Sequence, residues 1–340
     1  MPINYKNGII KEHLNVRNEA GVFDVSHMGQ ILIPFTDYNV KSLESFIPLN
    51  LNNISSNKCH YSFILNSNGG IIDDIMLSKF SFDQNEYIYI VYNASRKSNL
   101  KVIFEKIIQN YKIIEDRCLI AVQGPKSFSS LKNILNFSRN MKFLDIDILQ
   151  YNNSDIIISR SGYTGEDGFE LSILNKDSEQ LLIEILKNNI ILCGLGCRDS
   201  LRIEAGLSLY GNEINENISP VQAGLSWALD KTRLNDNSLN GSSILKEQLN
   251  SKKSTKKIGL IPTNKSMLRS NMLLLNESKK EIGYISSGCY SPVLKSSIGI
   301  GYIDKISEMS DKILVNVRDK FEELRIGKIP FITKNYKKEE

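Results

Sequence analysis

Two adjacent aspartates inside an otherwise apolar strand constrain the fold of this chain more than any other feature. Residues 66–77 read NSNGGIIDDIML and follow the apolar run CHYSFILN. The Asn-Gly-Gly sequence at 68–70 tolerates positive φ, so the two apolar runs are predicted to form strands joined by a tight turn. Side chains alternate along a strand, which places Asp73 and Asp74 on opposite faces. Each carboxylate lies among Ile, Met or Leu and therefore needs a polar partner.

A structural explanation of this pair competes with a functional one. In the structural explanation, one aspartate lies at the edge of a sheet and the other caps the turn. Structural hydrogen bonds and ion pairs also perturb carboxylates, so this stretch alone leaves both explanations open.

Length and composition are those of a globular protein with two or three domains. The 340 residues are 41% hydrophobic and 24% charged, and 42 basic against 38 acidic residues give a net charge of +4. This balance produces no field strong enough to predict nucleic-acid binding. No apolar run approaches the roughly 18 residues of a membrane span, so no membrane association is expected.

The cysteines and histidines predict neither disulfides nor a metal site. The five cysteines form no C-x-x-C pair and no secretory signal is evident, which together predict a reducing cytoplasm. The three histidines, at 13, 27 and 60, do not have the spacing of metal ligands.

Hydrophobic periodicity predicts a mixture of helices and strands in the first 200 residues. Helices are expected at 8–19, 38–46, 97–111, just beyond Gly124-Pro125, from Asp177 (with Gln180 in a capping box) and at 198–204. Strands are expected at 29–35, 59–66, 71–80, 86–95, 118–123, 143–150, 155–164 and 169–174. This order predicts an α+β fold and not a doubly wound sheet.

A polar, lysine-rich segment from Asn235 to Lys257 marks a predicted linker. Short strands separated by turns follow it, which predicts a small β-barrel. We therefore expect an α+β region at 1–240 and a barrel domain at 250–340.

Residues 161–171 (SGYTGEDGFEL) combine a glycine-rich turn with three acidic side chains. Glu166 and Asp167 are expected to lie in the turn and to be solvated. Glu170 enters a buried strand, where a carboxylate needs a positive or multi-donor partner. From the residues alone, the favoured partner is Arg198 or Arg202 in a structural ion pair.

Other short motifs exclude some activities. Neither G-x-G-x-x-G before a helix nor G-x-x-x-x-G-K-[ST] is present, so no NAD, flavin or nucleotide site is predicted. Asp24, Ser26 and His27 lie within four residues and cannot converge as a catalytic triad. We interpret Asp24 and Ser26 as cap or turn residues, and His27 as a hydrogen-bonded structural histidine.

Six blocks, in this order, resemble the aminomethyltransferase (T protein) family of the glycine cleavage system. They are GVFDVSHMG, NGGIIDDI, AVQGP, SGYTGEDGFEL, GLGCRDSLRIEAGLSLYGNEI and SGCYSPVL, and the resemblance runs from about residue 20 to the C-terminus. It implies a three-domain cloverleaf around a central folate pocket, in which residues 1–240 form two interleaved α+β subdomains. It also implies the reaction: an aminomethyl group on the dihydrolipoyl arm of the H protein is converted to 5,10-methylenetetrahydrofolate, with release of ammonia.

The resemblance also implies roles for particular residues. Asp74 matches the family's essential aspartate, and the residues implied to contact folate are Tyr61, Met76, Asn93, Tyr163, Glu170, Arg198 and Tyr336. Tetrahydrofolate is then a co-substrate, the lipoylated H protein is the partner, and no metal is required. We expect a monomer. The family has a Gly-Trp-containing segment before the Met-Pro at which this chain begins, so we expect the first strand of the first domain to be missing.

Three related activities were compared with this assignment, and the sequence argues against two of them. A folate-dependent demethylase of a methylated sulfur or nitrogen compound would share the scaffold and Asp74. A non-catalytic folate-binding maintenance factor would carry a K-G-C-Y-x-G-Q-E block, which is absent. A flavin-linked sarcosine-type oxidase would need an additional dinucleotide-binding domain, for which the chain is too short.

Overall fold

The computed structural model describes residues 1–82, 84–251, 255–303 and 312–337. The chain divides into two compact units. Unit 1 comprises residues 1–64, 73–198 and those from Asn335 onward, and unit 2 comprises residues 65–72 and 199–334. The predicted α+β class with a C-terminal barrel is confirmed. The predicted boundary near residue 240–250 stays a prediction.

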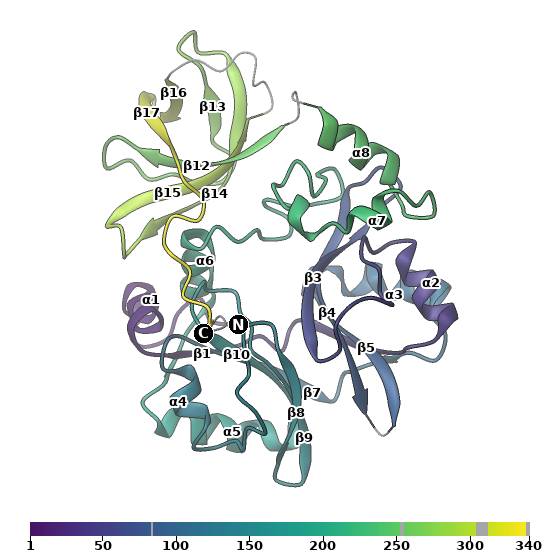
Figure 1. Ribbon diagram of the computed structural model, residues 1–340. Coiled ribbons are helices and arrows are strands. Elements are labelled where there is room, and N and C mark those ends of the chain that lie inside the picture. The colour runs from purple at the N-terminus through teal and green to yellow at the C-terminus, as the bar shows by residue number, and fades with distance from the viewer. Residues whose placement is uncertain (83, 252–254, 304–311, 338–340) are drawn as a thin grey trace. The chain divides into compact units, whose positions relative to one another are not determined.

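A six-stranded sheet forms one half of unit 1. Its order is β11-β1-β7-β10-β9-β8, antiparallel except for the parallel pair β1 and β11. The strands are β1 (Gly21–Asp24), β7 (Arg117–Gln123), β8 (Ile146–Tyr151), β9 (Ser154–Ser159), β10 (Gly168–Leu174) and β11 (Ile191–Leu192). Helices α4 (Ser127–Leu131) and α5 (Asn175–Lys187) cover one face and enclose an aliphatic and aromatic core with it (Figure 1).

A five-stranded antiparallel sheet forms the other half of unit 1. Its order is β3-β4-β5-β2-β6, with β2 (Gly29–Pro34), β3 (Lys58–Leu65), β4 (Ile71–Phe82), β5 (Asn85–Tyr92) and β6 (Lys112–Ile113). Further helices of this unit are α1 (Gly8–Asn18), α2 (Asp37–Glu44), the 3₁₀ turn η1 (Ala94–Arg96) and α3 (Lys97–Ile107). The two sheets pack through a shared apolar cluster that includes Cys59, Phe80, Tyr89 and Ile146.

The predicted hairpin is confirmed as β3 and β4, and its turn has a specific structure. The side-chain oxygen of Asn66 accepts hydrogen bonds from the backbone N–H groups of Asn68 and Gly70, both at 2.9 Å. Gly69 has φ +75°, and a Cβ on Gly70 would lie 1.8 Å from the carbonyl oxygen of Glu216. Asn66 therefore caps this turn, and neither aspartate does.

Unit 2 contains the predicted barrel and several short helices. The closed barrel has the order β12-β15-β14-β13-β16-β17, and its described strands are β12 (Lys256–Pro262), β13 (Leu273–Leu275), β14 (Glu281–Ser291), β15 (Ser296–Ile303), β16 (Ile313–Val317) and β17 (Lys320–Gly327). The helical elements are η2 (Ser226–Ala228), α7 (Lys231–Leu234) and α8 (Ser242–Asn250). The linker expected at 235–257 is thus partly wrong, because buried Leu245 anchors α8 inside it. Residues 252–254 lie outside the described residues.

Two helix starts also differ from the prediction. Helix α5 begins at Asn175 without a side-chain cap, so the capping box from Asp177 to Gln180 is wrong. Helix α6 (Leu195–Glu204) begins three residues before Arg198 and ends before Gly206, whose φ is +67°. Among the described residues, no helix is both long and apolar enough to cross a membrane.

Unit 2 contains a buried ion pair between Arg202 and Glu213. One guanidinium nitrogen of Arg202 is 2.6 Å from a carboxylate oxygen of Glu213, and both side chains are almost fully buried. Ser286 donates to the other Glu213 oxygen at 2.6 Å, and Arg202 also bonds Ser287 at 2.7 Å. The pair is therefore saturated with hydrogen bonds, which offsets the desolvation of the two charges.

We predict that Glu213→Ala lowers the free energy of unfolding by roughly 3–5 kcal/mol, because it leaves the Arg202 charge buried without its main partner. Urea unfolding followed by circular dichroism measures this. The control Glu247→Ala, at an exposed position of α8 in the same unit, should stay within about 0.5 kcal/mol of the parent. Equal losses for the two variants would contradict the prediction.

Candidate functional site

The aspartate pair lies near the start of β4, between β3 and β5, so neither residue is at a sheet edge. Burial alternates along β4 as predicted: Asp73 is fully buried and Asp74 is half-buried. The structural explanation, an edge residue and a turn cap, is therefore wrong. Both carboxylates lie on this middle strand, just beyond the point where β5 ends at Tyr92, and their charges must be balanced there.

Asn93, which directly follows β5, supplies that balance for both carboxylates. Its side-chain amide donates to Oδ1 of Asp73 and to Oδ1 of Asp74, each at 2.7 Å. Its backbone N–H donates to Oδ2 of Asp73 at 3.0 Å. Asp73 is thus held by two donors from one residue, which suits a carboxylate with no access to water.

Tyr61, on β3, holds the other oxygen of Asp74. Its hydroxyl donates to Oδ2 of Asp74 at 3.0 Å, and its ring packs edge-on against Phe63 at 5.3 Å. Asp74 is therefore fixed from β3 on one side and from the end of β5 on the other. Its partial exposure leaves this fixed carboxylate available to a ligand.

Burial raises the pKa of both aspartates above that of a solvated aspartate. It raises the pKa of Asp73 to about 7, with a further contribution from the Asp74 charge, while the Asn93 hydrogen bonds oppose the shift. Burial raises the pKa of Asp74 to about 6, opposed by the hydrogen bonds from Tyr61 and Asn93. The pair can therefore exchange a proton near neutral pH.

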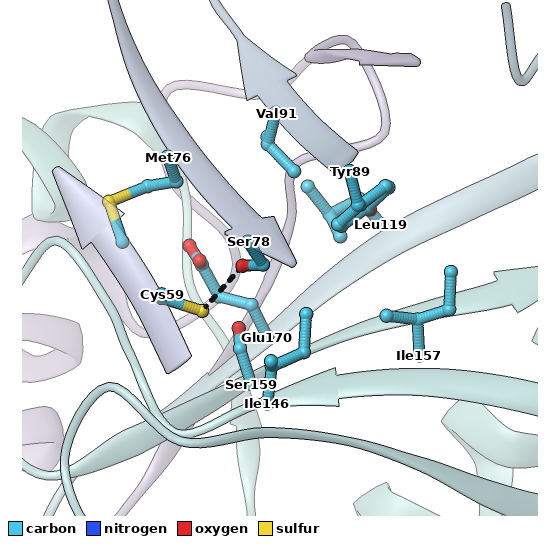
Figure 2. Close-up of a pocket in the computed structure, with 10 residues that line it drawn as sticks. All are labelled: Cys59, Met76, Ser78, Tyr89, Val91, Leu119, Ile146, Ile157, Ser159 and Glu170. Carbon is cyan, nitrogen blue, oxygen red and sulfur yellow. Dashed lines mark hydrogen bonds between the residues drawn. The ribbon is translucent and has the colours of Figure 1, made fainter. Parts of the chain in front are cut away.

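Glu170, on β10, lies against a small cavity between the two sheets of unit 1. Its carboxylate accepts a hydrogen bond from Ser161 at 2.9 Å. The cavity has a volume of about 20 Å³, and Figure 2 shows the Glu170 carboxylate pointing toward Met76 and Ser78 of β4. That volume holds about one water molecule and is too small for a ligand.

Arg198 and Tyr163 form a second part of the site. The Arg198 guanidinium lies 4.7 Å from the centre of the Tyr163 ring, a cation–π distance. Burial lowers the pKa of Arg198, while the charge of Glu170 raises it. In the described part of the chain, no ion pair joins Glu170 to Arg198, and Arg202 pairs with Glu213 instead. The structural ion pair expected for Glu170 is therefore wrong.

The other two acids of SGYTGEDGFEL are not solvated, contrary to the prediction. Glu166 is buried and pairs with Arg17 at 2.9 Å. Asp167 is nearly buried and receives two guanidinium nitrogens from Arg160, at 2.8 and 2.5 Å. Each carboxylate fixes one side of the glycine-rich turn that carries Tyr163. Sequence order could not reveal this, because Arg17 lies about 150 residues from Glu166.

Tyr336 is anchored near the C-terminus. Its ring stacks on Phe143 with centroids 3.9 Å apart and planes 8° from parallel. The backbone carbonyl of Lys337 accepts a hydrogen bond from Phe143 N–H at 2.9 Å, and Asn335 N–H donates to the carbonyl of Gly165 at 2.8 Å. The C-terminal segment therefore places Tyr336 beside the turn of residues 161–167.

All eight site residues predicted from the resemblance lie in unit 1. Direct contacts join Asp74 with Tyr61 and Asn93, and join Tyr163 with Arg198. Met76 and Glu170 line one cavity. Tyr336 stacks on Phe143, and its functional role stays a prediction.

The sequence predicts that His27 is a hydrogen-bonded structural histidine, but one of its ring nitrogens lacks a hydrogen-bond partner among the described residues. Asp24 and Ser26 do form a turn, with Ser26 N–H donating to Asp24 at 2.9 Å, as predicted. His27 Nδ1, in contrast, is buried without a hydrogen-bond partner among the described residues. An adjacent Ser-His sequence gives no signal for such an unpaired nitrogen.

Two further features of unit 1 have the form of ligand sites. A cleft of about 360 Å³ is lined by residues that include Lys97, Lys101 and Arg117, but by none of the eight predicted site residues. Glu12, Cys193 and Cys197 bring three potential metal-ligand atoms within 4.8 Å of one another. The Glu12 oxygens already accept backbone N–H groups of Tyr5 and Gly194, so this carboxylate also has a structural role.

Protein-family models match almost the whole chain. The model described as "GCVT N-terminal domain" matches residues 1–233, and the one described as "Glycine cleavage T-protein C-terminal barrel domain" matches residues 256–332. The second match coincides with the barrel formed by β12–β17.

Curated proteins and a solved structure match over most of their lengths. The mitochondrial aminomethyltransferase of Dictyostelium discoideum is 37% identical, covering 99% of this chain and 88% of that protein. The aminomethyltransferase of Staphylococcus saprophyticus is 33% identical over 98% of this chain and 92% of that protein. The crystal structure of aminomethyltransferase T from Bartonella henselae superposes with a TM-score of 0.90 at 29% identity, covering 99% of this chain and 93% of that chain.

The aspartate pair should titrate together near neutral pH. We predict carboxyl ¹³C shifts for Asp73 and Asp74 with apparent pKa values between about 6 and about 7. In Asp73→Asn, the remaining titration should move to lower pH, because the neighbouring negative charge is gone. The folded protein keeps these protons to higher pH than the unfolded chain, so the pair lowers stability as pH rises through this window. Titration of both residues near pH 4 would contradict the prediction.

Proposed function

Because this chain belongs to the glycine cleavage T-protein family and acts as an aminomethyltransferase of that system, we propose that unit 1 binds tetrahydrofolate with Asp74 as the catalytic residue. The observation that carries the assignment is the fixed, half-buried Asp74 carboxylate with its raised pKa. The co-substrate partner is the lipoylated H protein, which delivers the aminomethyl group. The cysteines support a reducing compartment as its place of action.

Asp74 serves the reaction by its charge and its position. The transfer releases an amine and passes through a state in which positive charge develops on the one-carbon unit. A carboxylate already fixed by Tyr61 and Asn93 stabilises that charge without reorganising. A pKa near the working pH also lets the same group exchange a proton with the leaving amine or the attacking nitrogen.

Tetrahydrofolate supplies the nitrogen nucleophiles when it is bound. Glu170 and Arg198 have the chemistry to bind its two ends. The pterin edge presents two adjacent N–H donors, and a carboxylate accepts such a pair in parallel bonds. We assign this role to Glu170, whose carboxylate accepts a hydrogen bond from the Ser161 hydroxyl. The glutamate tail is anionic and is matched by the Arg198 guanidinium, which has an unpaired Nη1 among the described residues.

The experiment that tests the proposal is formation of methylenetetrahydrofolate from aminomethyl-loaded H protein. The purified chain should release ammonia and form this product only when tetrahydrofolate and the loaded H protein are both present. Turnover of a methylated sulfur or nitrogen compound in place of loaded H protein would instead support the demethylase alternative.

We predict that Asp74→Asn abolishes turnover and leaves tetrahydrofolate affinity within about tenfold, or about 1.4 kcal/mol. The amide keeps the size of the carboxylate, its oxygen can still accept from Asn93 and its NH2 can donate to the Tyr61 hydroxyl oxygen, but the charge is lost. The control is Asp73→Asn, which leaves an N–H facing the Asn93 donors. It should lower stability by roughly 1–3 kcal/mol and retain turnover. An inactive Asp73→Asn beside an active Asp74→Asn would reverse the two roles.

Glu170→Gln should act on binding and not primarily on turnover. The amide presents one donor to the two donors of the pterin edge, and an unpaired buried donor costs about 1–3 kcal/mol. Tetrahydrofolate affinity should therefore fall roughly ten- to a hundredfold in titration calorimetry. Glu247→Gln, on the exposed surface of α8, is the matched control. Unchanged affinity in Glu170→Gln would remove Glu170 from the folate site.

A further inference from the structure

The cleft of about 360 Å³ lies within unit 1, and none of the eight predicted site residues lines it. Its volume is in the range of clefts that bind small organic molecules. Its lining comes from the start of β2, the end of β5, the start of α3 and the segment from the end of β6 to the start of β7. The cleft is therefore a candidate site for a ligand other than folate.

Gln30, on β2, presents a hydrogen-bond donor to this cleft. The residue is 2% exposed, and its Oε1 accepts from the hydroxyls of Tyr89 at 2.7 Å and Ser172 at 2.6 Å. Ser172 Oγ already accepts from Arg117 Nε, so the hydroxyl donates to Gln30, and this fixes which end of the amide is the oxygen. The Gln30 Nε2 group has no acceptor among the described residues. Because Gln30 lines the cleft and is otherwise buried, the cleft is where Nε2 meets a ligand.

Arg117, on β7, is held by the same hydrogen bonds. Its Nε donates to Ser172 Oγ at 3.0 Å, and its Nη2 donates to the backbone carbonyls of Ser172, at 2.6 Å, and of Asp155. These bonds fix the plane of the guanidinium, while Nη1 has no acceptor in the described part of the chain. Gln30 and Arg117 therefore present two preorganised donors, held through the one Ser172 side chain, to the cleft that both of them line.

The start of α3 adds positive charge where a helix disfavours it. Lys97 and Lys101 line the cleft from one face of this helix, and both are exposed. No side chain caps the helix start, and its first turn contains no acidic residue. Cations are unfavourable at a helix N-terminus, where an anion is stabilised. Among the described residues that line the cleft, Glu115 is the single acid, so the lining is positive on balance.

Apolar side chains lie beside these polar groups. They are Met28, Tyr92, Ile113 and Ile114. Oriented donors next to apolar surface are typical of a site for an organic ligand with one charged end. A phosphate monoester has such an end, with a charge of about −1.5 to −2 at pH 7 and three strong acceptor oxygens.

We propose that this cleft binds a compact phosphate monoester. The phosphate oxygens accept from Gln30 Nε2, Arg117 Nη1 and the Lys97 ammonium, and the organic group packs against Met28 and Tyr92. This inference goes beyond the proposed function and does not depend on it, because the folate residues and the cleft residues are different sets.

Phenyl phosphate is the probe for a test on the unaltered protein. Titration calorimetry near pH 8 should show saturable binding, and the Gln30 side-chain NH2 signal, identified by its loss in Gln30→Glu, should shift in nitrogen–proton NMR spectra. Benzyl alcohol, which is neutral, and benzoate, which has one charge, should each bind at least about tenfold more weakly. Absence of saturable binding overturns the inference. Equal affinity for either control compound also overturns it, because the cleft would then not select a phosphate.

Affinities of variants give the second measurement. Gln30→Glu keeps an oxygen that accepts from Tyr89 and Ser172 and replaces the donor by a negative oxygen, so phenyl phosphate should bind at least about tenfold more weakly. Lys97→Gln changes an exposed side chain, cannot disturb the core, and should weaken binding about three- to tenfold.

The matched control is Lys106→Gln. Lys106 is exposed in the last turn of the same helix and does not line the cleft, so this variant loses the same charge at a distance from the site. Its affinity for phenyl phosphate should stay within about twofold of the parent. Equal weakening in Lys97→Gln and Lys106→Gln would mean that only the overall charge attracts the probe, and would overturn the inference.

Tetrahydrofolate separates this inference from the proposed function. At saturating tetrahydrofolate, the affinity for phenyl phosphate should stay within about twofold, because the two ligands use different residues. A loss of about tenfold or more would place the probe in the folate site and overturn the inference. If the parent chain binds phenyl phosphate and no tetrahydrofolate, the proposed function fails and this inference stands.

Discussion

The hydrogen bonds from Asn93 to Asp73 and Asp74 are the interaction on which the site depends. Two carboxylates next to each other in a central strand would repel and would each lose their hydration. One amide group, 2.7 Å from both, together with a backbone N–H, offsets that cost. Asp73 takes most of these donors and is sealed from solvent, which leaves Asp74 half-exposed with a raised pKa. The pair therefore divides into one carboxylate that is sealed inside the protein and one that is accessible to a ligand.

Unit 1 supports this pair with polar contacts that come from distant parts of the chain. Arg17 and Arg160 neutralise Glu166 and Asp167, which holds the glycine-rich turn in place. The C-terminal segment returns to the same turn through Asn335. Every one of these charges is balanced inside the protein.

Much of the fold could be predicted because it follows local rules. The alternation of β4, the Asn-Gly-Gly turn and the barrel strands all follow from side-chain period and turn chemistry. The predictions of secondary structure were wrong where the local sequence carried little signal. Helix α8 lies in a polar segment that suggested a linker, since Leu245 is among the few apolar anchors of the helix. Helix α5 begins without a cap, so its start gave no sequence signal at Asn175.

The sequence by itself pointed to the residues to which we propose chemical roles, because an acidic side chain is costly in an apolar strand and is visible in the order of residues. It also determined the family, through six ordered blocks. Only the tertiary structure decided which side chains pair with these acidic residues. Glu170 bonds Ser161 and forms no ion pair with either arginine in the described chain, whereas Glu166 and Asp167 are buried in ion pairs. Pairings across some 150 residues depend on which strands become neighbours, and no local pattern records that.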